Sequence, residues 1–392
     1  MSSNQATRGT FALMLAHVAG LIDLVALPLW VGTLVQHYGL DFEHAGLTVT
    51  LFLLGAVGAS VWSAPRFDRV PRRLCAAGGF AVSAAGLLMA SRATAWPALV
   101  ALHIVAGIGT GCGLSMAHGA MGRSGNPHRL FALAGTALGV FAVVFYALVP
   151  RLMATAGSPS LFVVMAGLMA SAALASLGFP ADQASGAGAT RPSEPVRVPR
   201  AVWLLVTGVA CLALNQSIIF SFLERIGMAR GFGLDHVNSL LAAIGIVNLF
   251  PAPLSGFLQK RLPQVGVAIG ATLVQVGLAF TISSSSSFAP YAMAASFYAF
   301  VIIFAHPFVF GLTARLDPSG RTNALTPAML MIGSALAPAI AGIVAQRFGF
   351  AGLGMAVAGF GAIGVTCFAL LGRGMKRSRA GQAPLTAAPA AD

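Results

Sequence analysis

Arg69-Val70-Pro71 follows one long apolar run of the chain, and Arg261-Leu262-Pro263 follows another. The distance between the two is 261 − 69 = 192 residues, and the same offset separates Arg129 from Arg321 and Ala166-Gly167 from Ala358-Gly359. Three matches in one register indicate an internal duplication. A period of this length corresponds to six membrane-spanning helices and is far too long for a solenoid repeat.

The composition places the chain in a membrane. It is 57% hydrophobic and 8% charged, with a mean hydropathy of +0.84, which leaves too few polar groups for a water-exposed surface. Polar and turn-rich breaks divide it into twelve apolar segments, each long enough to cross a hydrocarbon core of about 30 Å as a helix. These segments are 10–36, 44–65, 73–92, 95–121, 130–154, 159–180, 201–223, 236–259, 263–285, 288–314, 322–346 and 350–372.

We therefore expect an all-α membrane protein with twelve transmembrane helices in two pseudo-symmetric six-helix bundles. The first bundle is expected over 1–180 and the second over 201–373. Residues 181–200 are rich in Ala, Gly, Ser and Pro and are expected to form a cytoplasmic linker, with a disordered cytoplasmic tail over 374–392.

The net charge of +13 is explained by membrane topology. With the N-terminus inside, 18 of the 23 basic residues fall on the inner face, and the five on the other side are Arg92, Arg151, Arg225, Arg230 and Arg347. Such an asymmetry fixes orientation and predicts a multi-pass protein of the cytoplasmic (inner) membrane with both termini in the cytoplasm. No nucleic-acid-binding motif accompanies the charge, so we expect no nucleic-acid partner.

The four cysteines lie in four different predicted spans and suggest buried thiols. We expect no metal and no cofactor. The sequence also shows no nucleophile–base pair and no nucleotide loop. A membrane enzyme or a non-transporting sensor is the alternative from another functional class, and those missing features disfavour it.

The loop Phe67-Asp68-Arg69-Val70-Pro71-Arg72-Arg73, between the second and third spans, carries a family signature. With the twelve spans and the central linker, it resembles the major facilitator superfamily, whose most widespread motif is D-R-x-G-R-[RK] at this place. Pro71 stands where the family usually has Gly. A weaker copy, Gly256-Phe257-Leu258-Gln259-Lys260-Arg261-Leu262-Pro263, follows span eight.

The resemblance implies that these loops form a cytoplasmic gate. An Asp beside several Arg residues can latch neighbouring helix ends through charge-assisted hydrogen bonds. The alternative is that the basic residues only set the topology. The gate residues implied by the family are Asp68, Arg69, Arg72, Arg73, Lys260 and Arg261.

Asp23 is the only acidic residue well inside a predicted span. A carboxylate there costs at least about 2.5–3.5 kcal/mol, so we expect it to face a wet cavity or to carry a proton. Gly20, Asp23, Leu27 and Trp30 share one helical face, which makes Trp30 a candidate cavity wall. The alternative is an Asp held only by packing hydrogen bonds.

His103 is the second candidate for proton coupling. The segment from Leu99 to Thr110 resembles the fourth-span motif L-x-x-R-x-x-Q-G-x-G of proton-coupled family members, with His103 in place of Arg and Ala106 in place of Gln. Imidazole changes its charge near neutral pH and can pass protons. A His satisfied by a hydroxyl or a carbonyl is the alternative.

The remaining polar groups of the spans give weaker predictions. Asn215, Gln216, Asn248 and His306 could line a cavity, although lone amides in membrane helices often only join helices. Glu224 and Arg225 end the predicted span seven and are expected to pair at the outer mouth or to be solvated.

No predicted span has Arg or Lys near its centre, so a neutral or weakly charged substrate is expected. The resemblance then implies a secondary active transporter that moves a small organic solute across the cytoplasmic membrane by alternating access, coupled to protons. A proton-driven drug or metabolite efflux antiporter is the alternative. The expected partners are the solute, protons and lipid, and the working unit is expected to be a monomer.

Overall fold

The structure is a computed structural model that describes residues 3–63, 66–67, 69–124, 127–179, 200–258, 260–316 and 326–381. These ranges are helical and contain no strand. The first half comprises α1 (Ser3–Gly20), α2 (Asp23–Gln36), α3 (Phe42–Ser63), α4 (Arg72–Ala90), α5 (Trp96–Gly122), α6 (Pro127–Ala156) and α7 (Ser160–Ser176). The second comprises α8 (Arg200–Ala229), α9 (Leu234–Val247), α10 (Pro251–Leu258), α11 (Gln264–Ser284), α12 (Phe288–Leu316), α14 (Thr326–Phe348) and α15 (Ala351–Gly381).

These helices make twelve apolar spans. Eleven spans of the described chain are long and apolar enough to cross a membrane, with α1 and α2 together forming one and α9 and α10 another. Helix α7 is shorter, at 17 residues, but its apolar length still reaches across a thin hydrocarbon core. The prediction of an all-α, twelve-helix membrane protein is confirmed.

The offset of 192 residues recurs in the helix starts. Helices α3 and α9 begin 234 − 42 = 192 residues apart, α4 and α11 begin 264 − 72 = 192 apart, and α5 and α12 begin 288 − 96 = 192 apart. The duplication read from three short sequence matches is therefore present in the folded chain.

The first span differs from the continuous helix expected over 10–36. Helix α1 ends at Gly20 and α2 begins at Asp23. Gly has a low helix propensity, and Asp prefers the first turn of a helix, where backbone N–H groups are unpaired. A glycine is also required here, because a Cβ at position 20 would overlap the side chain of Leu114.

The eighth span, expected as one helix over 236–259, is broken too. Helix α9 ends at Val247 and α10 begins at Pro251. Proline has no N–H to donate and disfavours helical geometry in the preceding residue, Phe250. Asn248 caps the C-terminus of α9 through its backbone N–H, which donates to the carbonyl of Ile244 at 3.0 Å.

Two helices extend beyond their expected ends. Helix α8 continues past 223 to Ala229, so Glu224 and Arg225 lie inside it. Glu224 is buried, and no ion pair joins it to Arg225 in the described chain, which corrects the expectation of a solvated or paired acid at the mouth. Helix α15 continues to Gly381.

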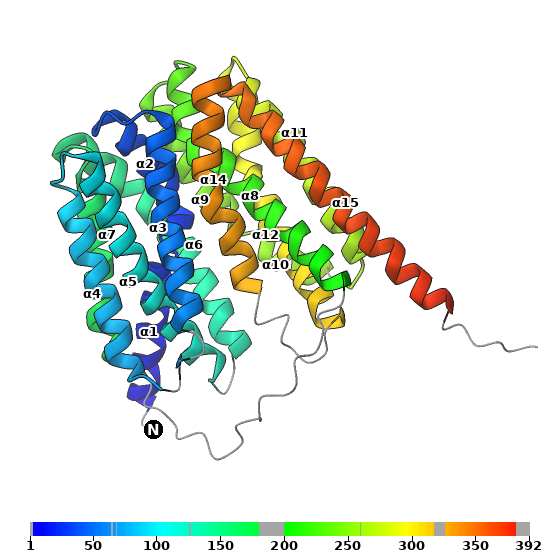
Figure 1. The fold of residues 1–392 in the computed structure, drawn as a ribbon, viewed down its shortest axis with the longest axis horizontal. Coiled ribbons are helices and arrows are strands. Elements are labelled where there is room, and N and C mark those ends of the chain that lie inside the picture. The colour runs from blue at the N-terminus through cyan, green and yellow to red at the C-terminus, as the bar shows by residue number, and fades with distance from the viewer. Residues whose placement is uncertain are drawn as a thin grey trace, which may run out of the picture.

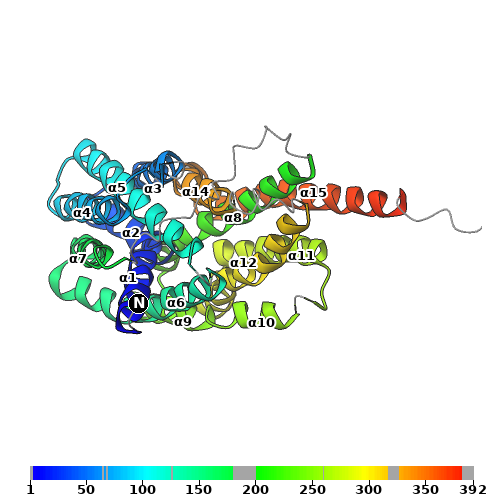
Figure 2. The same ribbon diagram turned by 90° about the horizontal axis from the view of Figure 1, so that it is seen from below.

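The two halves lie side by side in Figure 1, the first drawn in blue to teal and the second in green to red. The chain begins at the lower end of the view, and the turns after α2 and α14 lie at the upper end. We call this upper end, at residues 36–42, 229–234 and 348–351, the closed end. Toward the lower end α15 leans away from the first half, and the view from below shows the halves as two groups of helices (Figure 2).

Candidate functional site

Asp23 occupies the break in the first span. It is the first residue of α2 and is half-buried, whereas all residues from Val25 to Leu34 are buried. The partial positive charge of a helix N-terminus favours a carboxylate at this position. Within the described chain no ion pair joins Asp23 to a basic side chain. Broken helices of this kind form ion and substrate sites in membrane transporters.

Helix α6 touches both helix breaks. Its Tyr146 hydroxyl donates a hydrogen bond of 2.5 Å to the carbonyl of Val25, two residues after Asp23. A Cβ on Gly139, two turns earlier on the same face of α6, would meet Leu249 in the second break at 2.7 Å. Both breaks therefore lie against the same stretch of α6, between Gly139 and Tyr146.

His103 and Trp30 meet inside the first half. The indole N–H of Trp30 donates to Nε2 of His103 at 3.0 Å, and Nδ1 of His103 lies 2.7 Å from the carbonyl of Leu99. The imidazole is therefore neutral, with its proton on Nδ1, and both nitrogens are engaged. Both rings are fully buried, and Phe52 and Phe162 pack on the Trp30 ring edge-on. This geometry agrees with the alternative of a satisfied His, and the Trp30 ring is fully buried in this conformation.

The amides of α8 are buried within the second half. Asn215 is fully buried, and neither its Oδ1 nor its Nδ2 has a hydrogen-bond partner in the described chain. Its backbone carbonyl accepts the hydroxyl of Tyr298 at 2.7 Å. Gln216, the next residue, is half-buried and its Oε1 is likewise without a partner there. Unpartnered amides are costly in a dry interior, so these groups suit a polar or hydrated neighbour.

Asn248 and His306 are the remaining weak predictions. Both are half-buried, Asn248 in the break between α9 and α10 and His306 beside Pro307 within α12. Asn248 closes the half-helix before the second break, whereas Asp23 opens the half-helix after the first break, and His306 lies on a separate helix.

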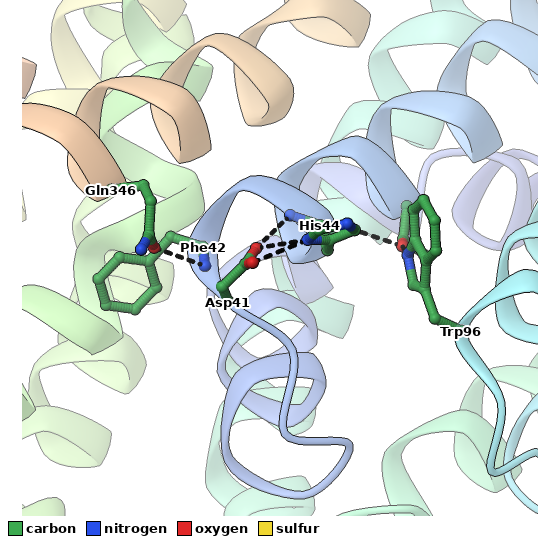
Figure 3. Close-up of polar contacts among 6 residues, drawn as sticks. Asp41, Phe42, His44, Trp96 and Gln346 are labelled. Atoms are coloured by element: carbon green, nitrogen blue, oxygen red, sulfur yellow. Dashed lines mark hydrogen bonds and ion pairs between the residues drawn. The ribbon is translucent and has the colours of Figure 1, made fainter.

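The closed end is held by contacts between α3 and the second half. The backbone N–H of Phe42 donates to Oε1 of Gln346 at 3.3 Å, and the Phe42 ring packs against Phe222 and Phe350. Figure 3 shows this contact beside Asp41, whose carboxylate caps α3 by accepting the backbone N–H of His44 at 2.8 Å.

Small residues bring α3 and α14 together further inside. A Cβ on Gly46 would overlap the carbonyl of Pro338, and one on Gly342 would overlap the carbonyl of Phe42. One turn deeper, the backbone N–H of Ala339 donates to Oγ1 of Thr50 at 3.0 Å. Close approach through glycine is how membrane helices gain packing energy. The halves are therefore in tight contact from the closed end toward the middle of the bundle.

The motif loop lies at the opposite end. Phe67 is buried, and the guanidinium groups of Arg72 and Arg123 lie over its ring at 4.3 and 4.7 Å. These cation–π contacts tie the loop to the end of α5. Arg69 and Arg73 are exposed, and Asp68 lies outside the described residues.

The second copy of the loop is simpler. Arg261 lies over the ring of Phe257 at 4.7 Å, and Lys260 beside it is exposed. Each loop thus places an Arg guanidinium over a Phe ring, at the end of the bundle where the chain begins.

Glu224 and Tyr146 are not among the site residues predicted from the sequence. Glu224 was placed at a helix end by a span boundary six residues too early, although an acid within an apolar run was the available signal. For Tyr146 no signal existed, because its partner is a backbone carbonyl.

Comparison with known proteins supports one family. A model of the Major Facilitator Superfamily matches residues 12–326. No curated protein matches the chain.

Solved structures of the same fold cover almost the whole chain. A bacterial homolog of the human lysosomal transporter Spinster, in an inward-facing and unoccupied conformation, is 16% identical with a TM-score of 0.73, covering 95% of this chain and 98% of that chain. The nucleoside transporter NupG is 14% identical with a TM-score of 0.70, covering 94% and 99%. A D-xylose-proton symporter is 15% identical with a TM-score of 0.69, covering 93% and 97%. At these identities the likeness shows the fold.

Proposed function

The chain belongs to the major facilitator superfamily, and we propose that it is a secondary transporter moving a small organic solute by alternating access, with Asp23 as the proton-binding residue. The family makes it a multi-pass membrane transporter and not an enzyme. Asp23, a carboxylate at the N-terminus of a half-helix in a broken span, is the observation that carries the proposal.

The surroundings of this carboxylate support proton coupling. Asp23 is half-buried and has no basic ion-pair partner within the described residues. A carboxylate in a membrane interior is costly unless it is paired, hydrated or protonated. Binding or release of a proton changes the charge of Asp23. Because alternating access also changes the exposure of Asp23 to water, protonation is linked to conformation.

The contacts between the halves support alternating access. They lie between the closed end and the middle of the bundle, at Phe42–Gln346, Gly46–Pro338 and Thr50–Ala339. With the N-terminus in the cytoplasm of an inner-membrane protein, the closed end is the outer face and the conformation is inward-facing. A related fold has been described in an inward-facing conformation. Separation of α3 from α14 would then open the outer side.

We place the solute near the two helix breaks, where Asp23, Asn248 and the α8 amides offer polar groups in an apolar bundle. The solute is neutral, because no described span carries Arg or Lys near its centre. The D-xylose-proton symporter and the nucleoside transporter of the same fold act on polar, uncharged solutes, one of them with protons. The two bundles, 1–180 and 201–373, are joined by 181–200 and work as a monomer. The two motif loops serve as the inner gate, through Asp68, Arg69, Arg72, Arg73, Lys260 and Arg261.

A ligand screen by thermal shift tests this proposal. Purified protein is heated with neutral solutes at about pH 5.5 and about pH 7.5, two values between which a buried carboxylate can exchange its proton. A bound solute raises the melting temperature by mass action. We expect a neutral ligand whose stabilisation depends on pH in the wild type and not in Asp23→Asn.

The matched control is Asp235→Asn, which removes a carboxylate from the first turn of another helix, α9, at an exposed site. It should leave the pH dependence of the ligand shift unchanged. A ligand shift with the same pH dependence in Asp23→Asn as in the wild type would rule out Asp23 as the proton-binding residue.

A further inference from the structure

A cavity of about 170 Å³ lies between the two halves at the closed end. Helices α2 and α6 of the first half form one side of it, and α8 and α9 of the second half form the other. Its polar lining includes Thr33, Glu224 and Asn238. Because the walls come from both halves, the cavity exists only while this end is closed.

Three oxygen atoms in this lining are buried without a hydrogen-bond partner in the described chain: Thr33 Oγ1, Glu224 Oε2 and Asn238 Oδ1. The side chains of Thr33 and Glu224 are 1% and 3% exposed. The carboxylate is also packed closely, since a Cβ on Gly32 would overlap Oε2. Buried polar groups are nearly always satisfied in native proteins, so three such oxygens on one cavity indicate a ligand.

The chemistry of these atoms selects the ligand. Carboxylate, hydroxyl and amide oxygens are the ligands preferred by hard cations. Glu224 is the one acidic residue among the cavity-lining residues, and no Lys, Arg or His is among them, so the lining itself carries one negative charge and no positive charge. Arg225 is the next residue of α8 but does not line the cavity, and its Nε and Nη1 are buried without hydrogen-bond partners in the described chain.

The size of the cavity favours an ion that keeps part of its water. A water molecule occupies about 30 Å³ of liquid volume, so the space is larger than a bare ion needs. We propose that this cavity binds one partly hydrated monovalent metal cation, with Glu224, Thr33 and Asn238 supplying oxygen ligands. The ion bridges the halves and stabilises the closed end.

Thermal stability in different salts tests the site. The purified protein is melted in sodium, potassium and choline chloride at equal ionic strength, so that screening is constant and only the small cations fit the cavity. The wild-type melting temperature should rise with the logarithm of the sodium or potassium concentration and not with that of choline. Equal melting in all three salts, or a shift caused by pH alone, would overturn the proposal.

Three variants locate the effect. Glu224→Gln keeps the size of the side chain and removes its charge, so the ion-specific shift should disappear. Thr33→Val removes one ligand and should raise the cation concentration needed for half of the shift several-fold; it also serves if Glu224→Gln does not fold. Glu43→Gln removes an acid at the same end that does not line the cavity, and it should behave like the wild type.

A full ion-specific shift in both Glu224→Gln and Thr33→Val would place the cation elsewhere and overturn the proposal. The measurement needs no transported solute. Its failure would therefore leave the proposed transport through Asp23 standing, and failure of the ligand screen would leave this site standing.

Discussion

The indole N–H of Trp30 has its acceptor on the imidazole of His103, and both rings are fully buried between α2, α3, α5 and α7. The second imidazole nitrogen is engaged by the carbonyl of Leu99. A charged imidazole carries a proton on both nitrogens, so Nε2 of His103 would need an acceptor. The Trp30 indole N–H that faces Nε2 is a donor. This geometry agrees with a structural role for His103.

His103→Leu should therefore destabilise the protein without altering proton coupling. It leaves the Trp30 N–H buried and unpaired, at a cost of about 1–3 kcal/mol. Thermal unfolding should show this loss, and adding Trp30→Phe should recover part of it, because donor and acceptor are then both absent. Abolished pH dependence of ligand binding, with unchanged stability, would instead return His103 to the proton pathway.

Asp41 gives the closed end a pH-dependent cap. The backbone N–H of His44 donates to its carboxylate, and this hydrogen bond lowers the pKa of Asp41. Since the pKa is lower in the folded state, the cap stabilises the protein above the unfolded-state pKa, and this contribution is lost as the pH falls through the folded-state pKa.

Asp41→Asn, which still caps the helix, should remove the charge-dependent part of this stability. The side chain is 44% exposed, so we expect a difference below about 1 kcal/mol. Melting curves between about pH 7 and about pH 3 should show the wild type more stable at the upper end and the two proteins converging at the lower end. A constant difference over the whole range would contradict the assignment.

At the level of elements, contact between α3 and α14 sets the closed end. Gly46 and Gly342 allow backbone approach that no larger residue permits. Gly46→Leu should therefore push the helices apart and shift the protein toward a state open at this end.

Spin labels at Thr94→Cys and Ser286→Cys report this opening. The two positions are exposed, lie in the turns before α5 and α12, and are 286 − 94 = 192 residues apart, so they are equivalent in the two halves. The distance between the labels should increase in Gly46→Leu. Gly58→Leu, on the same helix with nothing within 4 Å of a Cβ, should leave it unchanged. An equal distance in both variants would show that the glycine contact does not hold this end closed.

The sequence predicted which segments are helical better than it predicted where they break. Apolar length alone marks a span, so it predicts one continuous helix for each of the two broken spans. Gly20 and Pro251 are local signals of a break, but such residues are also tolerated within membrane helices, and the surrounding packing decides. The burial of Glu224 depends on α2 of the other half, which no local pattern reveals.

At the level of the whole molecule, the duplication was readable because short motifs recur at a fixed offset of 192 residues. The helix starts follow the same offset in three pairs, so equivalent helices can be assigned between the halves. The relative placement of the halves was not readable, since it rests on contacts to the backbone, such as the Ala339 N–H donating to the Thr50 hydroxyl, that carry no sequence signature. For the same reason the sequence does not predict the cavity between the halves.

Proton-driven flux in proteoliposomes tests the central claim most directly. With the neutral solute found in the ligand screen, an imposed pH gradient should drive accumulation by the wild type, with protons moving together with the solute or against it. Asp23→Asn should still exchange solute but no longer accumulate it, whereas Asp235→Asn should match the wild type. Undiminished pH-driven accumulation by Asp23→Asn would contradict the account.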